Sequence, residues 1–169
     1  MKALEEYKEL INLVDSFLGK KGFLRNGSCF YIKNNKNWGL IDFQKSKNNT
    51  DDEIKFTINI GIYSSALFEF FSPDSPEKKP SIEDCHWRMR LGFLLPNNKD
   101  LWWIIRKGQS LDSLASELMT YIENLAIPMM MEHISDEKLL NEWLSGKSPG
   151  LTDIQRLINL SSLLKDRKS

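Results

Sequence analysis

Residues 54–62 restrict the fold of this chain more than any other segment. Apolar residues at Ile54, Phe56, Ile58, Ile60 and Ile62 alternate with Lys55, Thr57, Asn59 and Gly61. Because successive side chains of a strand point to opposite faces, this alternation gives one apolar face and one polar face. The pattern is typical of an antiparallel sheet that packs on helices on one side and is open on the other.

Shorter stretches of similar character surround this strand. They predict strands over residues 23–25, 28–32, 38–44, 86–91 and 101–105. Pro96, Asn97 and Asn98 lie between the last two stretches and favour a turn, so we expect these two strands to pair as a hairpin. Three prolines among charged residues predict a loop over residues 72–84.

Helical periodicity precedes and follows the strands. Apolar residues recur at spacings of three and four over residues 4–18, which predicts an amphipathic N-terminal helix. Ser110, Ser135 and Thr152 are suitable N-caps for three later helices. We expect Pro128 to interrupt the first of these three, because proline cannot donate its main-chain hydrogen bond.

The order of these elements indicates the fold class. Strands and helices that are segregated along a chain favour an α+β fold over a wound parallel sheet. We therefore predict an N-terminal helix, an antiparallel sheet of five to six strands with one open face, and C-terminal helices. No linker or internal repeat divides the sequence, so we expect a single domain over residues 1–169.

Charge and composition narrow the classes of function. Lys and Arg together number 23, as do Asp and Glu, so the formal net charge is zero. Proteins that bind nucleic acid usually carry a basic excess, so we expect no nucleic-acid partner. The sequence shows neither a secretory pattern nor an apolar run long enough for a membrane span, so we expect no membrane partner. We expect a cytoplasmic protein in which Cys29 and Cys85 are reduced.

Familiar catalytic and metal-binding motifs are missing from the sequence. The phosphate-binding loop, the dinucleotide fingerprint, the nucleophile elbow and the zinc-protease motif have no match. The run Glu83-Asp84-Cys85-His86 contains four residue types that bind metals, but neighbouring side chains on a strand diverge. We expect no metal, no cofactor and no catalytic residue.

The polar faces of the strands hold the best candidates for a functional site. Side chains at positions 86, 88 and 90 share one side of their strand, and two arginines there offer planar donors that suit carboxylate or phosphate. If the polar faces of neighbouring strands coincide, the candidate site consists of polar residues ringed by two aromatic ones: Gln44, Asn59, His86, Arg88, Arg90, Tyr31 and Trp38.

The two arginines need a compensating charge. Residues two apart on a strand lie about 7 Å apart on the same face, so Arg88 and Arg90 repel each other. We expect Asp42 or Glu69, or else an anion or an acidic partner from outside, to offset this repulsion.

These features are consistent with two functions. They are also consistent with a solvated face that has no function and whose arginines pair with nearby carboxylates. The first is a non-catalytic module that binds a protein partner through the open sheet face or the 72–84 loop, for instance an immunity protein or an antitoxin. The second is an enzyme or sensor that holds a small anionic metabolite at Arg88 and Arg90. A deep pocket at the arginines favours the second function, and a flat or apolar patch favours the first.

Several short segments together resemble a known family. They include Gly22-Phe23, Phe30-Tyr31, Ile41-Asp42-Phe43-Gln44-Lys45-Ser46, Phe56-Thr57-Ile58-Asn59-Ile60-Gly61, Trp87-Arg88 and Arg90-Leu91-Gly92. With these segments the chain resembles a bacterial family catalogued as a domain of unknown function, DUF4304. The resemblance covers residues 3–130 and leaves 135–169 as a helical C-terminal extension. It implies one domain and carries no catalytic residues or ligands.

Overall fold

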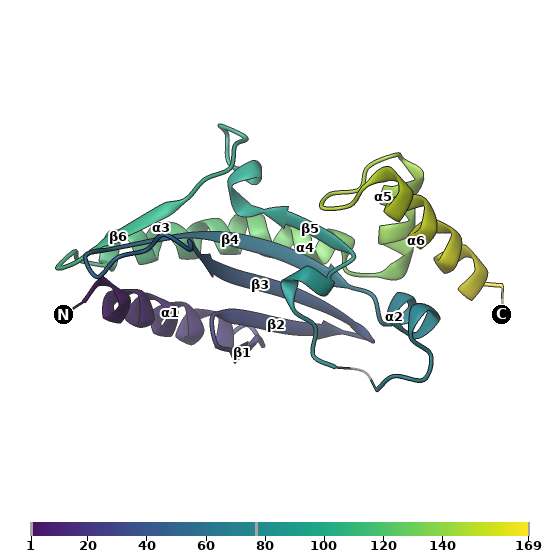
Figure 1. Ribbon diagram of the computed structural model, residues 1–169, viewed down its shortest axis with the longest axis horizontal. Helices are drawn as coiled ribbons and strands as arrows, with labels where there is room; N and C mark the ends of the chain where they lie inside the picture. Colours follow the sequence, from purple (N-terminus) through teal and green to yellow (C-terminus); the bar gives the residue numbers. More distant parts are fainter. Residues whose placement is uncertain (1, 77, 169) are drawn as a thin grey trace.

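An antiparallel sheet forms the centre of the computed structural model, which describes residues 2–76 and 78–168. Within these residues the sheet has six strands, in the order β1-β2-β3-β4-β5, with β6 also paired to β4. The strands are β1 (Leu24–Asn26), β2 (Cys29–Asn34), β3 (Asn37–Lys45), β4 (Glu53–Tyr63), β5 (Trp87–Arg90) and β6 (Trp103–Arg106). The sheet, a helix before it and helices after it confirm the predicted α+β fold (Figure 1).

Strand β4 pairs with different strands along its two edges. Strand β3 pairs with it from Phe56 to Tyr63 on one side. On the other side, β6 pairs with the first part of β4 and β5 pairs with the last part. The predicted hairpin between residues 86–91 and 101–105 is therefore wrong. Strands β5 and β6 run in the same direction along β4, and the connection between them includes the 3-10 helix η2 (Leu91–Leu94).

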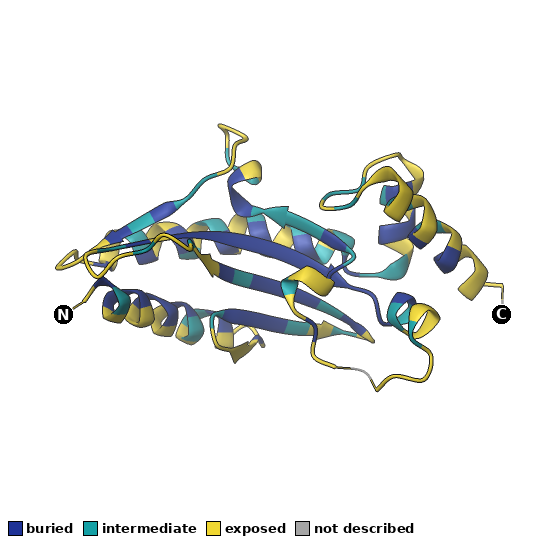
Figure 2. Cartoon of the chain, in the orientation of Figure 1, coloured by how far each residue is buried: buried dark blue, intermediate teal, exposed yellow. Residues whose placement is uncertain are grey.

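Three helices cover one face of the sheet (Figure 1). They are α1 (Ala3–Gly19), α3 (Asp112–Tyr121) and α4 (Ile127–His133). The isoleucines of β4 and Phe56 are buried in the core between the sheet and these helices, whereas Lys55 on the other face is exposed. Most of β4 is accordingly dark blue in Figure 2. This confirms the direction in which the alternating side chains of β4 point.

Pro128 does not interrupt the helix in which it lies. The π-helical turn η3 (Ile122–Ala126) joins α3 directly to α4, and Pro128 occupies the first turn of α4. The main-chain N–H of Ile127 donates to the Ile122 oxygen, five residues back, so the chain enters α4 through a π turn. The expected interruption is thus replaced by a local change in helix type.

Two helices close the chain, and a third, unexpected one follows β4. Ser135 caps α5 (Asp136–Leu144) and Thr152 caps α6 (Asp153–Asp166), each accepting a main-chain hydrogen bond of 3.2 Å, as predicted. The predicted cap at Ser110 is wrong, because Leu111 occupies the N-cap position of α3 and no side chain caps it. The short helix α2 (Ser65–Phe71) was not anticipated. It packs beside α6 at the end of the sheet away from the N-terminus (Figure 1).

The second face of the sheet is partly covered. A small apolar cluster lies on it, formed by Cys29, Tyr31, Leu40, Tyr63 and Cys85, with Trp38, Phe68 and Ile82 against them. Ile82 begins the 3-10 helix η1 (Ile82–Asp84), which forms at the end of the stretch predicted as a loop. Gly61 permits this cover, because a Cβ there would lie 2.6 Å from the Cys85 sulfur. Both cysteines are buried free thiols.

The packing of β4 predicts the effect of placing a charge in the core. Ile58→Asp would bury an unpaired carboxylate at a fully buried position, so the free energy of unfolding should fall by about 3 kcal/mol or more. Urea unfolding followed by circular dichroism measures this loss. Lys55→Gln on the opposite face is the control and should change stability little. A wild-type melting temperature for Ile58→Asp would mean that the assigned face of β4 is incorrect.

Candidate functional site

Strand register brings four of the predicted site residues onto one face of the sheet. Asn59 pairs with Asp42 on one side and with Arg90 on the other, and Arg88 pairs with Gly61. Gln44 lies two residues beyond Asp42 on the same face of β3. The side chains of Gln44, Asn59, Arg88 and Arg90 all line one cavity on the face that the large helices leave uncovered.

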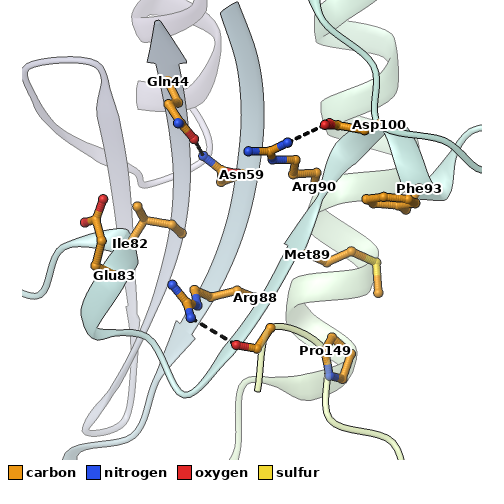
Figure 3. A pocket seen from close by; sticks show the side chains of 11 residues that line it. Gln44, Asn59, Ile82, Glu83, Arg88, Met89, Arg90, Phe93, Asp100 and Pro149 are labelled. Carbon is orange, nitrogen blue, oxygen red and sulfur yellow. Dashed lines mark hydrogen bonds and ion pairs between the residues drawn. The ribbon is translucent and has the colours of Figure 1, made fainter. Parts of the chain in front are cut away.

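The cavity has a volume of about 660 Å³. Figure 3 shows Ile82 and Glu83 on one flank of the two arginines, and Met89 and Phe93 on the other. The full lining is Gln44, Asn59, Ile82, Glu83, Arg88, Met89, Arg90, Phe93, Asp100, Pro149 and Gly150. The cavity lining therefore combines charged and amide groups with apolar side chains.

Arg90 is neutralised from within the chain. It forms an ion pair with Asp100, and its guanidinium lies 5.3 Å from the centre of the Trp102 ring. Trp102 also donates to Asp100 through its indole nitrogen at 3.3 Å. The compensating carboxylate thus comes from the segment between β5 and β6. This corrects our expectation, which placed the internal partner at Asp42 or Glu69.

Arg88 is held in place without being neutralised. Its Nη2 donates to the Gly150 carbonyl oxygen at 3.0 Å, and its main-chain N–H donates to the Pro149 oxygen at 3.1 Å. Its Nε is buried and has no hydrogen-bond partner among the residues that the structure describes. No described carboxylate lies within 4.0 Å of the guanidinium. Arg88 therefore has no direct ion-pair partner among the described residues, and Glu83 is the acidic residue that shares the cavity with it.

The close contact at Arg88 requires a glycine at position 150. Gly150 has a φ of +77°, a conformation that side chains disfavour. A Cβ there would lie 2.7 Å from the Cβ of Arg88. The loop before α6 can thus approach β5 closely enough for its carbonyl oxygens to restrain the arginine.

An amide and carboxyl group form the other side of the cavity floor. Asn59 Nδ2 donates to Gln44 Oε1 at 3.0 Å and to Asp42 Oδ2 at 3.3 Å. Burial raises the pKa of Asp42, and the nearby negative charge of Glu83 raises it further, while the hydrogen bond from Asn59 acts in the opposite direction. These contacts fix the Asn59 and Gln44 amides beside Arg90.

The other three predicted site residues lie outside this cavity. His86 lines a separate hollow of about 340 Å³, where its ring lies 5.1 Å from that of Tyr63. Tyr31 and Trp38 meet edge to face in the apolar cluster, with ring centres 6.2 Å apart. The side chain of Lys79 lies over Tyr31 and that of Lys33 over Trp38. The expected aromatic ring around the arginines is therefore not formed by these residues.

Ser64, His86 and Asp136 lie close together but are not arranged as a catalytic triad. His86 Nδ1 accepts a hydrogen bond of 2.9 Å from the main-chain N–H of Ser64, not from its hydroxyl. The Ser64 hydroxyl is fully buried and donates to Asp136 at 2.7 Å. A nucleophilic serine needs a base on its hydroxyl and access to substrate. We conclude that this group joins the end of β4 to α5.

Seven of the residues that line the cavity were not identified from the sequence. They are Ile82, Glu83, Met89, Phe93, Asp100, Pro149 and Gly150. Pro149 and Gly150 come from the loop before α6, far along the chain from β5. Within residues 2–76 and 78–168, no three His, Cys, Asp or Glu side chains are grouped to hold a metal. Among the same residues, no helix is both long and apolar enough to cross a membrane.

The fold and cavity define an α+β domain with an arginine-lined pocket on the sheet face that α1, α3 and α4 do not cover. The model of the family described as "Domain of unknown function (DUF4304)" matches residues 14–132, and the chain belongs to this family. The match confirms the resemblance noted in the sequence and includes every cavity residue except Pro149 and Gly150. Comparisons with curated proteins and with solved structures gave no match.

The burial of His86 predicts a pH dependence of stability. Burial lowers the pKa of His86 from 6.5 to about 4, against smaller opposing effects of Asp136 and Asp84. Between these values the unfolded chain binds a proton that the folded protein does not, so stability is lost as the pH falls. The loss should reach roughly 3 kcal/mol by pH 4.

A comparison with His86→Asn isolates this contribution. The asparagine amide oxygen can accept the Ser64 N–H and does not titrate. The free energy of unfolding of the wild type should fall more steeply than that of the variant between pH 6.5 and 4. The pH-dependent effects of other groups, including Asp42, occur in both proteins and cancel when the two stability curves are subtracted. Parallel curves would show that His86 is equally easily protonated in both states.

Proposed function

We propose that this domain binds a small anionic molecule at Arg88, in the cavity on the helix-free face of the sheet. The observation that carries the proposal is the state of Arg88: its guanidinium donates to the Gly150 main-chain oxygen and has no carboxylate within ion-pair distance among the described residues. A partly buried cation without a counter-charge is unfavourable, and a bound anion would supply that charge.

The shape of the site also supports a small ligand over a protein partner at this face. Ligand-binding pockets usually measure about 300–1,000 Å³, and the cavity of about 660 Å³ lies within that range. A flat polar sheet face would have favoured docking of a protein. Here Ile82 and Glu83 of η1 lie on one side of the arginines and Phe93 of the segment after β5 lies on the other (Figure 3). The groups at the site are suited to binding, and we propose a binding or sensing role.

Anion binding should raise the thermal stability of the wild-type protein. At low millimolar concentration and matched ionic strength, at least one of acetate, sulfate and phosphate should increase the melting temperature beyond the effect of chloride, through mass action. Arg88→Gln should remove the increment while the protein stays folded. Arg106→Gln is the matched control, because Arg106 on β6 is exposed and pairs with Glu53 away from the cavity.

The control also separates specific binding from general salt effects. Sulfate and phosphate stabilise most proteins by exclusion from their surface, and that effect should be equal in all three proteins. An increment that persists in Arg88→Gln would therefore be non-specific. If none of the anions distinguishes the wild type from this variant, the proposed function is wrong.

A second candidate function rests on an apolar surface at the other end of the molecule. Six exposed large apolar side chains lie on α2 and α6: Phe70, Phe71, Ile154, Leu157, Ile158 and Leu164. All but Leu164 line a shallow hollow of about 430 Å³ between the two helices. Ile154 is 72% exposed, although isoleucine is among the residues most often buried. Such clustering indicates an interaction surface, which we name the α2–α6 surface.

We propose that a second copy of this chain covers the α2–α6 surface. The exposed residues on α6 recur at spacings of three and four, which suits packing against another helix. The helix begins with the acidic Asp153, which is largely exposed, and its last turn carries Lys165. Two copies of α6 packed antiparallel would place each acidic end beside a basic end and oppose their dipoles favourably.

Self-association should depend on this apolar stripe. Sedimentation velocity at increasing concentration should show the wild type shifting from monomer to dimer, and Leu157→Asp should remain monomeric. Leu24→Asp on β1 is the matched control, since Leu24 is 62% exposed and lies outside the surface. A wild type that stays monomeric at about 100 μM, well above micromolar dissociation constants, would exclude a stable dimer.

A further inference from the structure

We infer that the molecule bound at Arg88 is a monocarboxylate with an apolar body, and not a phosphate compound. This inference rests on the function proposed above and specifies the chemical class of the ligand. It is drawn from the charges that line the cavity and from the apolar side chains that flank the arginines. Each of these observations excludes a different alternative.

The charge of the cavity favours an anion with a single negative charge. Two arginines and two acidic residues line it, namely Arg88, Arg90, Glu83 and Asp100, so their formal charges cancel. Asp100 is committed to Arg90, which leaves one guanidinium to receive the ligand. A dianionic phosphate would bring a second negative charge close to Glu83 with no second free arginine to offset it. A carboxylate carries the one charge that Arg88 lacks.

The donor geometry of Arg88 also suits a carboxylate. A guanidinium has five N–H groups in one plane. The structure shows one of its side-chain nitrogens, Nη2, donating to the Gly150 oxygen, which restrains the group, while Nε is buried, so the donors left for a ligand are on the two Nη atoms. A planar carboxylate can then take two parallel hydrogen bonds from the remaining donors. Because the arginine is already restrained, little side-chain entropy is lost on binding.

The sides of the cavity indicate what is attached to the carboxylate. Ile82 stands on one flank of Arg88 and Met89 and Phe93 stand on the other, with Pro149 nearby (Figure 3). Phe93 is 44% exposed, although a large aromatic side chain gains by burial. An apolar body extending from the carboxylate would cover Phe93 and Ile82. A phosphate or a sugar would leave them uncovered and would find few polar partners on this wall.

The inference predicts how affinity changes with chain length. Isothermal titration calorimetry of the full chain would compare acetate, butyrate, hexanoate and octanoate at one pH and ionic strength. Burial of each added methylene should tighten binding about threefold to fourfold until the cavity is filled. Inorganic phosphate and 1-hexanol test the two ends of the ligand separately. Each should bind at least about tenfold more weakly than hexanoate, since one lacks the apolar body and the other lacks the charge.

Two variants assign these effects to named side chains. Phe93→Ala should weaken hexanoate by about tenfold and reduce the gain per methylene, while acetate binding changes little. Leu24→Ala is the control, because Leu24 is an exposed large apolar residue on β1 that lies outside both the cavity and the α2–α6 surface. Arg88→Gln should abolish the preference for hexanoate over 1-hexanol.

The outcomes separate this inference from the function on which it rests. If phosphate binds as tightly as hexanoate and Phe93→Ala changes neither, anion binding at Arg88 stands and the apolar carboxylate is excluded. If hexanoate binds equally to the wild type and to Arg88→Gln, the carboxylate is not recognised at Arg88 and this inference fails, whereas the proposed function fails only if acetate, sulfate and phosphate also do not distinguish the two proteins. If hexanoate does not bind the wild type at all but phosphate does, the ligand class inferred here is wrong.

Discussion

The alternation of side chains along β4 is the constraint on which the rest of the structure depends. This strand pairs with β3 along one edge and with β5 and β6 along the other, so the register of these three strands is set directly against it. Its isoleucines are buried against the helices. A shift of one residue would bring Asn59 into that core and carry Ile58 to the opposite face. The same register that secures the core therefore fixes the position of the amides beside the arginines.

The candidate site is built by elements that are distant in the sequence. Strand β5 supplies both arginines, but the two lie in different electrostatic surroundings. Asp100 neutralises Arg90 from the segment before β6, whereas Arg88 receives only carbonyl oxygens from Pro149 and Gly150. Main-chain oxygens orient a guanidinium without cancelling its charge. This difference leaves Arg88 free for an external anion and explains why the two arginines are not equivalent.

The sequence predicted the facing of side chains better than it predicted their neighbours. A period of two determines which residues of a strand share a face, so Asn59, Arg88 and Arg90 were grouped correctly. The same period does not identify the partner strand, and the hairpin between β5 and β6 was therefore wrong. Asp100 and Gly150 could not be predicted as site residues, because they follow no periodic pattern. Only tertiary packing brings them to the arginines.

The segment between β5 and β6 can vary in sequence without disturbing the sheet. Each of the two strands takes its register directly from β4, so the segment that joins them does not have to maintain any pairing of its own. That segment carries Phe93 and Asp100, which form part of the cavity wall. Insertions and substitutions there can change the shape of the wall while the sheet remains as it is. Under the proposed function, changes in this segment would alter which molecule the cavity accepts at little cost in folding stability.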